Sequence, residues 1–407
     1  EAKIAEELGR ILMDGSLYRG AKPVMWSPVE KTALAEAEIE YEDHTSTTIY
    51  ARFPVTHAAH AALEGASIII WTTTPWTMPA NRAVAYGDDI SYQVTKVLAT
   101  NEGALCGKGD VVVIADDLAD SVINAIGASE TKIRAHVMGR EMAGSIAAHP
   151  MAGHGYDFDV PLLAGSHVTT EQGTGFVHIA PGHGVEDYEL AHLKHGIAVP
   201  DTVGEDGVIL AHLPVFGGMH VLRDNAKIAE IMAEHKGVIG IGKLVHSYPH
   251  SWRSKAPLIY RNTAQWFVSM ESNGLRDIAL GELAKTKFYP AAGQKRLTSM
   301  IAQRPDWCLS RQRAWGVPLT IFAHKQTGEP LRDPAVHARI VEAMKAEGAD
   351  CWFMSEASRF LGDDYNPDDY EKITDILDVW FDSGSTHSFV LEDRVDLESP
   401  ADLYLEG

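Results

Sequence analysis

Two polar clusters in the sequence hold the residue types best suited to chemistry. The first is WTTTPWTMPANR at residues 71–82, in which three consecutive threonines and then Asn81 follow a run typical of a β-strand. Hydroxyl and amide groups can orient a water molecule or hold a ribose, although none of them is a strong base. Pro75 cannot join the ladder of a central strand, so we expect a loop that begins where the strand ends.

The second cluster is GTGFVHIAPGHGVEDY at residues 173–188, where glycines flank a short strand and allow a backbone to approach a ligand closely. Its candidate functional side chains are His178, His183, Glu186 and Asp187. The two histidines are five residues apart, and the intervening proline and glycine exclude the helix on which paired histidine ligands usually lie. A metal-dependent hydrolase that uses His178, His183 and Asp187 nevertheless remains an alternative.

The elements that must position these clusters are short strands broken by turns. β-rich runs at 67–71, 111–114 and 176–179 are separated by Gly, Pro and Asp clusters. Helical spacing predicts helices over 3–14, with Gly15 as a stop signal, over 187–195 and over 226–236, and a helix-like stretch over 32–40. These patterns predict an α+β fold: a β-barrel-like domain with peripheral helices.

Composition narrows the function classes. The 407 residues suggest two or three domains, and the net charge of −21 excludes a uniformly basic nucleic-acid binder. Charge is uneven: residues 252–313 hold 11 Lys and Arg against 4 Asp and Glu, whereas residues 347–378 hold 10 acidic side chains. The basic stretch could meet a phosphate backbone.

Three widely spaced cysteines suggest neither disulfides nor a thiolate zinc site, which fits a reducing cytosol.

Five strings carry a resemblance to a known family. In order, they are WTTTPWTMPANRAV, GTGFVHIAPGHGVEDY, YPHSWRSKAPLIYRNTAQWFVSM, RPDWCLSRQRAWGVP and DVWFDSGSTHS. Together they resemble the isoleucyl-tRNA synthetases, which are class I aminoacyl-tRNA synthetases, and specifically the insertion that carries their editing domain. The resemblance extends from residue 15 to residue 407. The related valyl and leucyl enzymes carry an arginine after the first two threonines, where this chain has Thr74.

The chain also departs from parts of that family. It contains neither the HIGH-type nor the KMSKS-type motif that binds ATP. We therefore expect no cofactor for editing, and ATP and magnesium only for the full-length ligase. At 26–28 and 250–254 the chain lacks the cysteine pairs of a zinc-bearing branch, so we expect no structural zinc. The missing initial methionine leads us to expect a piece of a longer protein.

The resemblance implies hydrolysis of the ester of mischarged Val-tRNA(Ile), with Ile-tRNA(Ile) spared, because a single pocket separates valine from isoleucine only weakly. It implies that Asp187 receives the α-ammonium group of the substrate and that His178 lines the side-chain pocket. The implied holders of the terminal adenosine and the attacking water are Thr72, Thr73, Thr74 and Asn81. Trp76 and His183 are assigned to substrate binding.

Other interpretations of these residues stay open. Asp187 could cap a helix that begins near Tyr188, and His183 could be a structural residue of the glycine-rich turn. No Ser-His-Asp or Cys-His arrangement is evident, so direct attack by water is favoured. A non-catalytic tRNA-docking module is a further alternative, and its contacts would be Lys285, Lys287, Lys295 and Arg296.

With the resemblance, four segments are predicted. They are a connecting segment or stalk at 1–46, the editing domain core at 47–245, a return segment with the basic stretch at 246–325, and an acidic segment leading back to the class I catalytic domain at 326–407. The expected partner is the 3′ end of tRNA(Ile) carrying valine. We expect a cytoplasmic monomer without a membrane segment, because no apolar run approaches the ~20 residues that a spanning helix needs.

Overall fold

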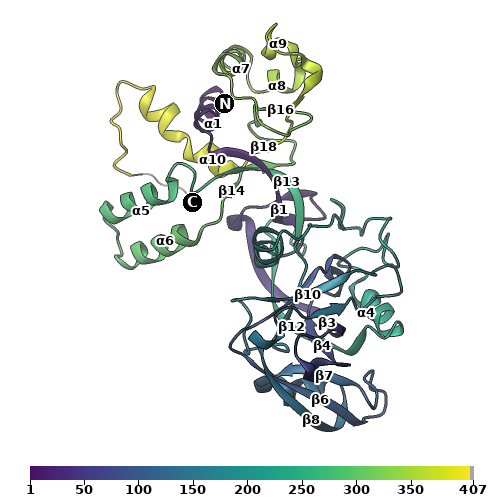
Figure 1. The fold of residues 1–407 in the computed structure, drawn as a ribbon. Coiled ribbons are helices and arrows are strands. Elements are labelled where there is room, and N and C mark those ends of the chain that lie inside the picture. Colours follow the sequence, from purple (N-terminus) through teal and green to yellow (C-terminus); the bar gives the residue numbers. More distant parts are fainter. Residues whose placement is uncertain (404–407) are drawn as a thin grey trace. The chain divides into compact units, whose positions relative to one another are not determined.

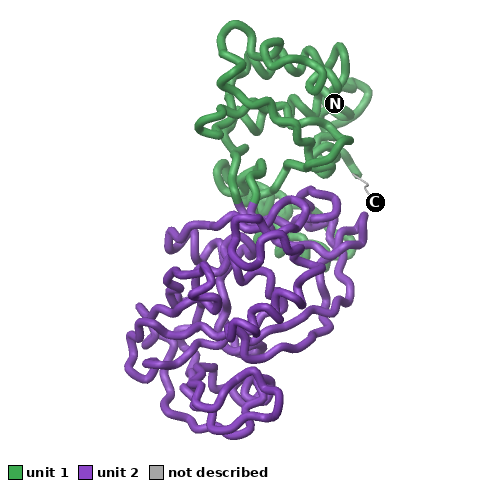
Figure 2. The backbone as a smooth tube through the Cα atoms, turned by 90° about the vertical axis from the view of Figure 1, so that its right-hand side faces the viewer, with its two compact units in different colours: residues 1–21, 263–407 green, residues 22–262 purple. Residues whose placement is uncertain are grey.

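The structure is a computed structural model that describes residues 1–403. Residues 404–407, the end of the predicted acidic segment, lie outside the described residues. The contacts divide the chain into two compact units (Figure 2): residues 22–262, here called the sheet unit, and residues 1–21 with those from 263 onward, here called the terminal unit. The chain passes from one unit to the other in β1 (Leu17–Ser27) and again in β13 (Ile259–Val268).

The bounds of these units arise from one long strand pair. In β3 (Ile39–His57) and β12 (Val238–Ser251), antiparallel pairing runs from Ala51 opposite Val238 to Ile39 opposite Ser251, with one register shift between Val238 and Gly240. This pairing includes residues 39–46 and 246–251, and the sheet unit as a whole extends over residues 22–262. The four segments named from the sequence remain a prediction of domain organisation.

The sheet unit is built on a ten-stranded mixed sheet (Figure 1). Its order is β11-β5-β10-β9-β3-β4-β7-β6-β8, and β12 pairs with β3 outside this path. The strands not yet given are β4 (Ser67–Thr72), β5 (Ala83–Tyr86), β6 (Ser91–Thr100), β7 (Val111–Ala115), β8 (Ala128–Met138), β9 (Ile146–Ala148), β10 (Asp159–Ala164) and β11 (Phe176–Ile179). The runs predicted at 67–71, 111–114 and 176–179 are thus confirmed as strands. All five residues of β7 are buried, as expected of a continuous apolar run inside a sheet.

The sheet bends, but the strands do not form a closed ladder. The Ala115 N–H at the end of β7 donates to the Thr174 carbonyl at 2.9 Å, and the Tyr92 hydroxyl of β6 donates to the Gly175 carbonyl at 2.7 Å. These bonds hold the approach to β11 against β6 and β7. Within residues 1–403 the strand order is still an open path with β11 and β8 at its ends. The mixture of helices and strands is confirmed, whereas the barrel-like arrangement is not.

Short helices and turns complete the sheet unit. They are η1 (Glu36–Glu38), η2 (Ala61–Leu63), η3 (Pro75–Ala80), η4 (Asp116–Leu118), α2 (Ala119–Ala125), η5 (Gly139–Met142), α3 (Val185–Tyr188), η6 (Glu189–Lys194) and α4 (Asn225–Glu234), together with the two-residue strand β2 (Thr32–Ala33). The helix predicted over 226–236 is α4. The helix predicted over 187–195 begins earlier, at Val185, and continues as the π-helical η6.

The helix-like stretch predicted over residues 32–40 is wrong. Its first two residues form β2, which pairs with β1 through Trp26 opposite Ala33. One short 3₁₀ turn, η1, then leads into β3. Pairing with the preceding strand, across the turn at residues 28–31, outweighs the helical propensity of the Ala and Glu residues in this stretch.

The terminal unit contains most of the longer helices. They are α1 (Ala2–Asp14), α5 (Leu275–Lys285), α6 (Ala292–Gln303), α7 (Pro334–Glu347), α8 (Asp350–Met354), α9 (Ser358–Leu361), η7 (Pro367–Asp369), α10 (Val379–Gly384) and η8 (His387–Glu392). Its short strands are β14 (Trp307–Cys308), β15 (Ser310–Arg311), β16 (Phe322–His324), β17 (Tyr370–Lys372) and β18 (Ile376–Leu377). The helix predicted over 3–14 is confirmed as α1, and Gly15 ends it with φ +87°. None of the helices in residues 1–403 is both long and apolar enough to cross a membrane.

Gly175→Ala should destabilise the sheet unit, because this glycine has φ +78° and an added Cβ would lie 2.3 Å from the Cβ of Ala115. Gly144→Ala is a matched control: φ is +87°, but no atom lies within 4 Å of the added Cβ. The control should lose only the left-handed backbone preference, about 1–2 kcal/mol. Gly175→Ala should lose a further ~1–3 kcal/mol from overpacking. Urea unfolding followed by tryptophan fluorescence measures both losses, and equal losses would contradict the predicted close approach.

Candidate active site

The two polar clusters meet because β5 pairs with β11. The antiparallel register places Val84 opposite His178 and Ala83 opposite Ile179. The Arg82 N–H extends this ladder by donating to the Ile179 carbonyl at 2.9 Å. The end of the first cluster therefore lies beside the middle of the second, although about a hundred residues separate them in the sequence.

The threonines of the first cluster form a compact turn after β4. The Thr74 N–H donates to the Thr72 hydroxyl oxygen at 3.1 Å, and the Thr77 hydroxyl donates to the Thr74 carbonyl at 2.9 Å. Pro75 occupies the first turn of η3, so the loop expected at the end of the strand is confirmed. Thr72 is buried, whereas Thr73 and Thr74 are partly exposed. The Thr74 hydroxyl oxygen lies 3.1 Å from that of Thr72, whereas the Thr73 hydroxyl has no partner in residues 1–403 and can meet a ligand.

His178 is held as a neutral ring between two polar neighbours. Its Nε2 lies 2.9 Å from the Thr77 hydroxyl oxygen, and its Nδ1 lies 3.4 Å from the Asn81 side-chain nitrogen. Because the Thr77 hydrogen is committed to the Thr74 carbonyl, this network assigns the ring proton to Nε2 and leaves Nδ1 as an acceptor. Burial lowers the pKa of His178 to about 3, so the imidazole is uncharged at neutral pH.

Asn81 is fully buried with one polar atom left over. Its amide nitrogen donates to the Ala83 carbonyl at 2.8 Å. Its Oδ1 has no hydrogen-bond partner in the described part of the chain. A buried acceptor without a partner costs about 1–3 kcal/mol. A water molecule or a ligand hydroxyl group that donated to this oxygen would recover that cost.

Asp187 lies in the first turn of α3, with its carboxylate turned back toward β11. Its Oδ2 accepts the Ala180 N–H at 2.8 Å. Burial raises the pKa of Asp187 to about 7; the Ala180 bond opposes this rise and the neighbouring Glu186 adds to it. In residues 1–403 no Lys or Arg forms an ion pair with this carboxylate. The residue that caps α3 is Gly184, so the interpretation of Asp187 as the helix cap is wrong.

His183 has both ring nitrogens engaged by the protein. Its Nδ1 lies 2.8 Å from the Tyr260 carbonyl and its Nε2 lies 2.7 Å from the Thr202 hydroxyl oxygen. Its ring also meets that of Trp76 edge-on, with centroids 4.9 Å apart. Burial lowers the pKa of His183 to about 4. These contacts favour the structural interpretation of His183, as the residue that ties the glycine-rich turn to η3.

The same contacts argue against the metal-site alternative. The side chains of His178, His183 and Asp187 are each directed to separate protein partners. Across residues 1–403, no group of three or more His, Cys, Asp and Glu side chains is arranged to hold a metal ion.

Several partners were not identified from the sequence. Thr77 was visible within the first cluster, three residues after Thr74, but its bond to His178 depends on the β5–β11 pairing. The Ala180 N–H is a backbone group without any sequence signal. The remaining partners come from distant segments: Thr202 and Tyr260 on His183, and Asn225, whose Oδ1 accepts the Trp76 N–H at 3.3 Å.

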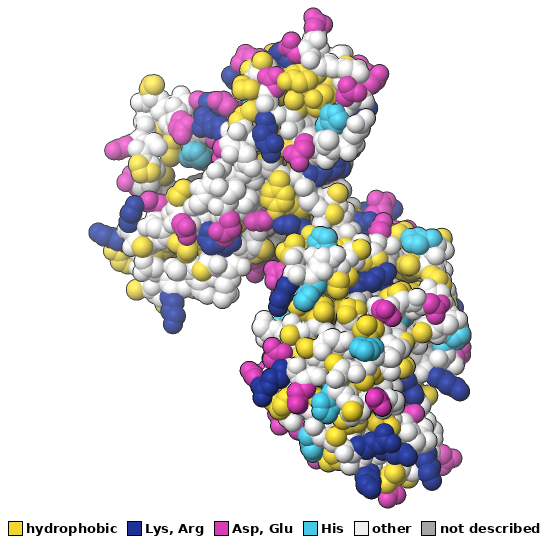
Figure 3. All heavy atoms as spheres, viewed as in Figure 1, with side chains coloured by type: hydrophobic (Ala, Val, Ile, Leu, Met, Phe, Trp, Pro, Cys, Tyr) yellow, Lys and Arg dark blue, Asp and Glu magenta, His cyan; other side chains and the backbone are white. Residues whose placement is uncertain are grey.

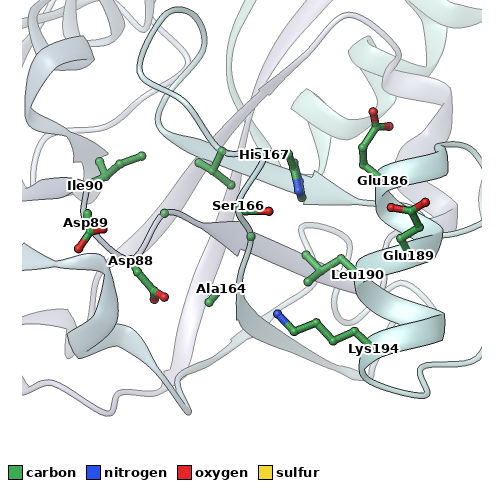
Figure 4. Close-up of a pocket in the computed structure, with 13 residues that line it drawn as sticks. Asp88, Asp89, Ile90, Ala164, Ser166, His167, Glu186, Glu189, Leu190 and Lys194 are labelled. Carbon is green, nitrogen blue, oxygen red and sulfur yellow. The ribbon is translucent and has the colours of Figure 1, made fainter. Parts of the chain in front are cut away.

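A cavity of about 640 Å³ lies beside α3 and η6, the helical segments that follow the glycine-rich turn (Figure 4). From α3 and η6, Glu186, Glu189, Leu190 and Lys194 line it. Its other walls are residues 87–90 and 164–168. Asp187 does not line this cavity, so the cavity and the predicted site are distinct features.

Comparison with known proteins places the chain in a family. The family described as tRNA synthetases class I (I, L, M and V) matches residues 1–407, and the chain belongs to it. Within this family, an isoleucine--tRNA ligase of Pelagibacter ubique is 52% identical over 407 residues, which are 100% of this chain and 44% of that protein. Those of Gluconobacter oxydans and Caulobacter vibrioides are 51% and 50% identical, again over 100% of this chain and 44% of theirs. The resemblance found in the sequence is therefore confirmed.

The chain spans less than half the length of these curated relatives. One solved structure, titled "The crystal structure of GlLeuRS-CP1", matches with a TM-score of 0.39 at 10% identity, over 48% of this chain and 98% of that chain.

Replacing Asp187 by Asn should change how stability depends on pH. Because the folded-state pKa of about 7 lies above the ordinary 3.8, the folded protein holds this proton more tightly than the unfolded chain does. The carboxylate therefore lowers the free energy of unfolding as pH rises from about 4 through 7. Asn cannot ionise, so Asp187→Asn should be more stable than the parent chain at pH 8, with that advantage gone below pH 4.

Urea unfolding at several pH values measures this difference. Glu189→Gln, at an exposed position on the adjoining η6, controls for the removal of one negative charge. The assigned burial of Asp187 is contradicted if its Asn variant shows the same stability difference from the parent chain at pH 4 and at pH 8.

Proposed function

We propose that this chain hydrolyses the ester bond between valine and tRNA(Ile) and spares the isoleucine ester. The observation that carries the proposal is the carboxylate of Asp187, which has no cationic side-chain partner in the described residues. The β5–β11 pairing places the turn before Asp187 and the threonine turn at the same end of these two strands. The name of the relatives, isoleucine--tRNA ligase, supports tRNA as the partner and isoleucine as the amino acid to be protected. The ligase reaction itself is proposed only for the longer enzyme, with ATP and magnesium.

Asp187 is proposed to receive the α-ammonium group of the bound amino acid. An ammonium group near the carboxylate favours its ionised form, and a hydrogen bond between two charged groups is stronger than a neutral one. The bond from Ala180 fixes one carboxylate oxygen. The other oxygen is then available to the ligand.

The adenosine end and the attacking water are proposed to lie against the threonine turn. Thr73 and Thr74 are partly exposed in this turn, and the buried Thr72 accepts the Thr74 N–H. The Oδ1 of Asn81, which has no partner in the described residues, is a hydrogen-bond acceptor for the ligand or the water. His178 is a poor general base, because its pKa is about 3 and both ring nitrogens are engaged. Catalysis is therefore proposed to rest on positioning water against an ester that is already reactive.

Rejection of isoleucine is proposed to rest on His178. A larger aliphatic side chain binds a roomy apolar pocket better than a smaller one does, so selective hydrolysis of valine requires a steric wall. The His178 ring is fixed at both nitrogens and is 8% exposed, so it cannot swing aside freely. Such a ring provides that wall.

A deacylation assay with Val-tRNA(Ile), run with and without 1,10-phenanthroline at constant magnesium, tests the proposed function. The proposal predicts hydrolysis that the chelator leaves unchanged. A metal-dependent hydrolase would lose its activity to the chelator. A docking module would bind the tRNA without cleaving the ester, and either outcome would contradict the proposal.

Asp187→Ala should lower the rate of Val-tRNA(Ile) hydrolysis by at least about tenfold, the equivalent of one charge-assisted hydrogen bond of roughly 1.5–3 kcal/mol. Glu189→Ala, which removes an exposed carboxylate from the same helical segment, should retain the parent rate. Circular dichroism confirms that both variants are folded. Near-parental hydrolysis by a folded Asp187→Ala variant would refute the role of the carboxylate.

His178→Ala should keep cleaving Val-tRNA(Ile) and begin to cleave Ile-tRNA(Ile), because removing the ring opens space for one more methylene group. Thr77→Val is a matched variant that removes only the hydroxyl bound to Nε2. It should relax selectivity in the same direction but less, since the ring remains. Deacylation of both charged tRNAs is measured side by side. Loss of both activities in folded His178→Ala would instead identify His178 as part of the chemistry.

A further inference from the structure

The helical hairpin of the terminal unit stands apart from the apolar core of that unit. α5 and α6 pack against each other (Figure 1), and the Gln294 side chain donates to the Leu283 carbonyl at 3.1 Å. Neither helix contains a buried residue. Packing against the described residues therefore does not explain the sequence of this hairpin, here defined as residues 275–303.

The acidic residues of the hairpin, Asp277 and Glu282, both lie in its first helix, and beyond them its charge is of one sign. Residues 283–305 contain five Lys and Arg and no Asp or Glu, in a chain whose net charge is −21. Lys285 is paired with Glu282 at 2.7 Å. Lys287, Lys295 and Arg296 are exposed and have no hydrogen-bond or ion-pair partner in residues 1–403. Figure 3 shows dark blue side chains at the margin of this part of the molecule.

An aromatic ring lies among these cations. Tyr289, in the link between α5 and α6, is 91% exposed. A protein surface that binds unpaired nucleic acid combines cations along the backbone with an exposed ring on which a base can stack. Cations alone would fit any polyanion, and the exposed ring between them distinguishes RNA from an acidic peptide.

We propose that the hairpin docks RNA, with Lys287, Lys295 and Arg296 on phosphates and Tyr289 stacked on an unpaired base. The proposal deepens the proposed function and rests on it, since it names a surface in the terminal unit that holds the tRNA whose ester the sheet unit hydrolyses. The hairpin is a binding surface only, and none of its residues takes part in hydrolysis.

Fluorescence anisotropy of the whole chain with uncharged tRNA(Ile), titrated at several salt concentrations, tests the proposal. A triple variant that removes the three cations should weaken binding at low salt by about tenfold or more. It is Lys287→Ala/Lys295→Ala/Arg296→Ala, here called the hairpin variant. It should also make the log–log salt slope shallower by about 2, at ~0.7 per lost contact to single-stranded phosphate. Tyr289→Ala should weaken binding about fivefold or more, and Tyr289→Phe, which keeps the ring, should not.

The matched control removes three exposed cations of the same unit that already have carboxylate partners. It is Lys345→Ala/Arg359→Ala/Arg394→Ala, whose partners are Glu342, Glu347 and Asp396. This control should change affinity little. An equal loss in the control, or equal competition by polyglutamate and by RNA, would overturn the proposal.

Hydrolysis separates this proposal from the proposed function. At saturating Val-tRNA(Ile), the hairpin variant should keep the parental kcat and show a raised KM. If the parent chain does not hydrolyse the ester, the proposed function fails while the anisotropy result still decides the docking surface. If the parent chain hydrolyses the ester and the hairpin variant binds tRNA with parental affinity, the docking proposal alone is overturned.

Discussion

The candidate site depends on the pairing of β5 with β11. This short antiparallel register sets Arg82 against Ile179 and thereby brings the threonine turn beside the glycine-rich turn. The bond between Thr77 and His178, which joins the two clusters, presupposes that alignment, whereas the bond from Ala180 to Asp187 forms within the glycine-rich turn itself. A slip of one residue would turn His178 to the other face of the sheet. The backbone hydrogen bonds between β5 and β11 thus set the positions from which the polar side chains of the two clusters can contact each other.

Burial decides what each titratable group can do once it is placed. It keeps His178 and His183 neutral, with pKa values of about 3 and 4, so both rings act as uncharged hydrogen-bonding groups. It has the opposite consequence for Asp187, whose pKa of about 7 leaves a carboxylate that gains most from a positively charged ligand. One physical effect therefore keeps the two histidine rings uncharged and raises the pKa of the Asp187 carboxylate.

The sequence predicted helices and strands better than it predicted which residues contact each other. Runs such as residues 111–114 form strands because their apolar residues are continuous, and Gly15 ends α1 because it adopts a left-handed conformation. The stretch 32–40 and the cap assigned to Asp187 failed because each depends on a neighbour: β2 pairs with β1, and α3 begins after Gly184. The residues of the site were predicted from a resemblance, but the partners of His183 come from distant segments that no local pattern connects to it.

We propose that the site beside the β5–β11 pair recognises an aminoacyl ester by its ammonium group and by a limit on side-chain size. Calorimetric titration of the chain with non-hydrolysable amide analogues of valyl-adenosine and isoleucyl-adenosine tests it directly, since no reaction intervenes. We expect the valyl analogue to bind and the isoleucyl analogue to bind at least about tenfold more weakly, the size of the penalty expected for excluding one methylene group. Equal affinity for the two analogues would contradict it.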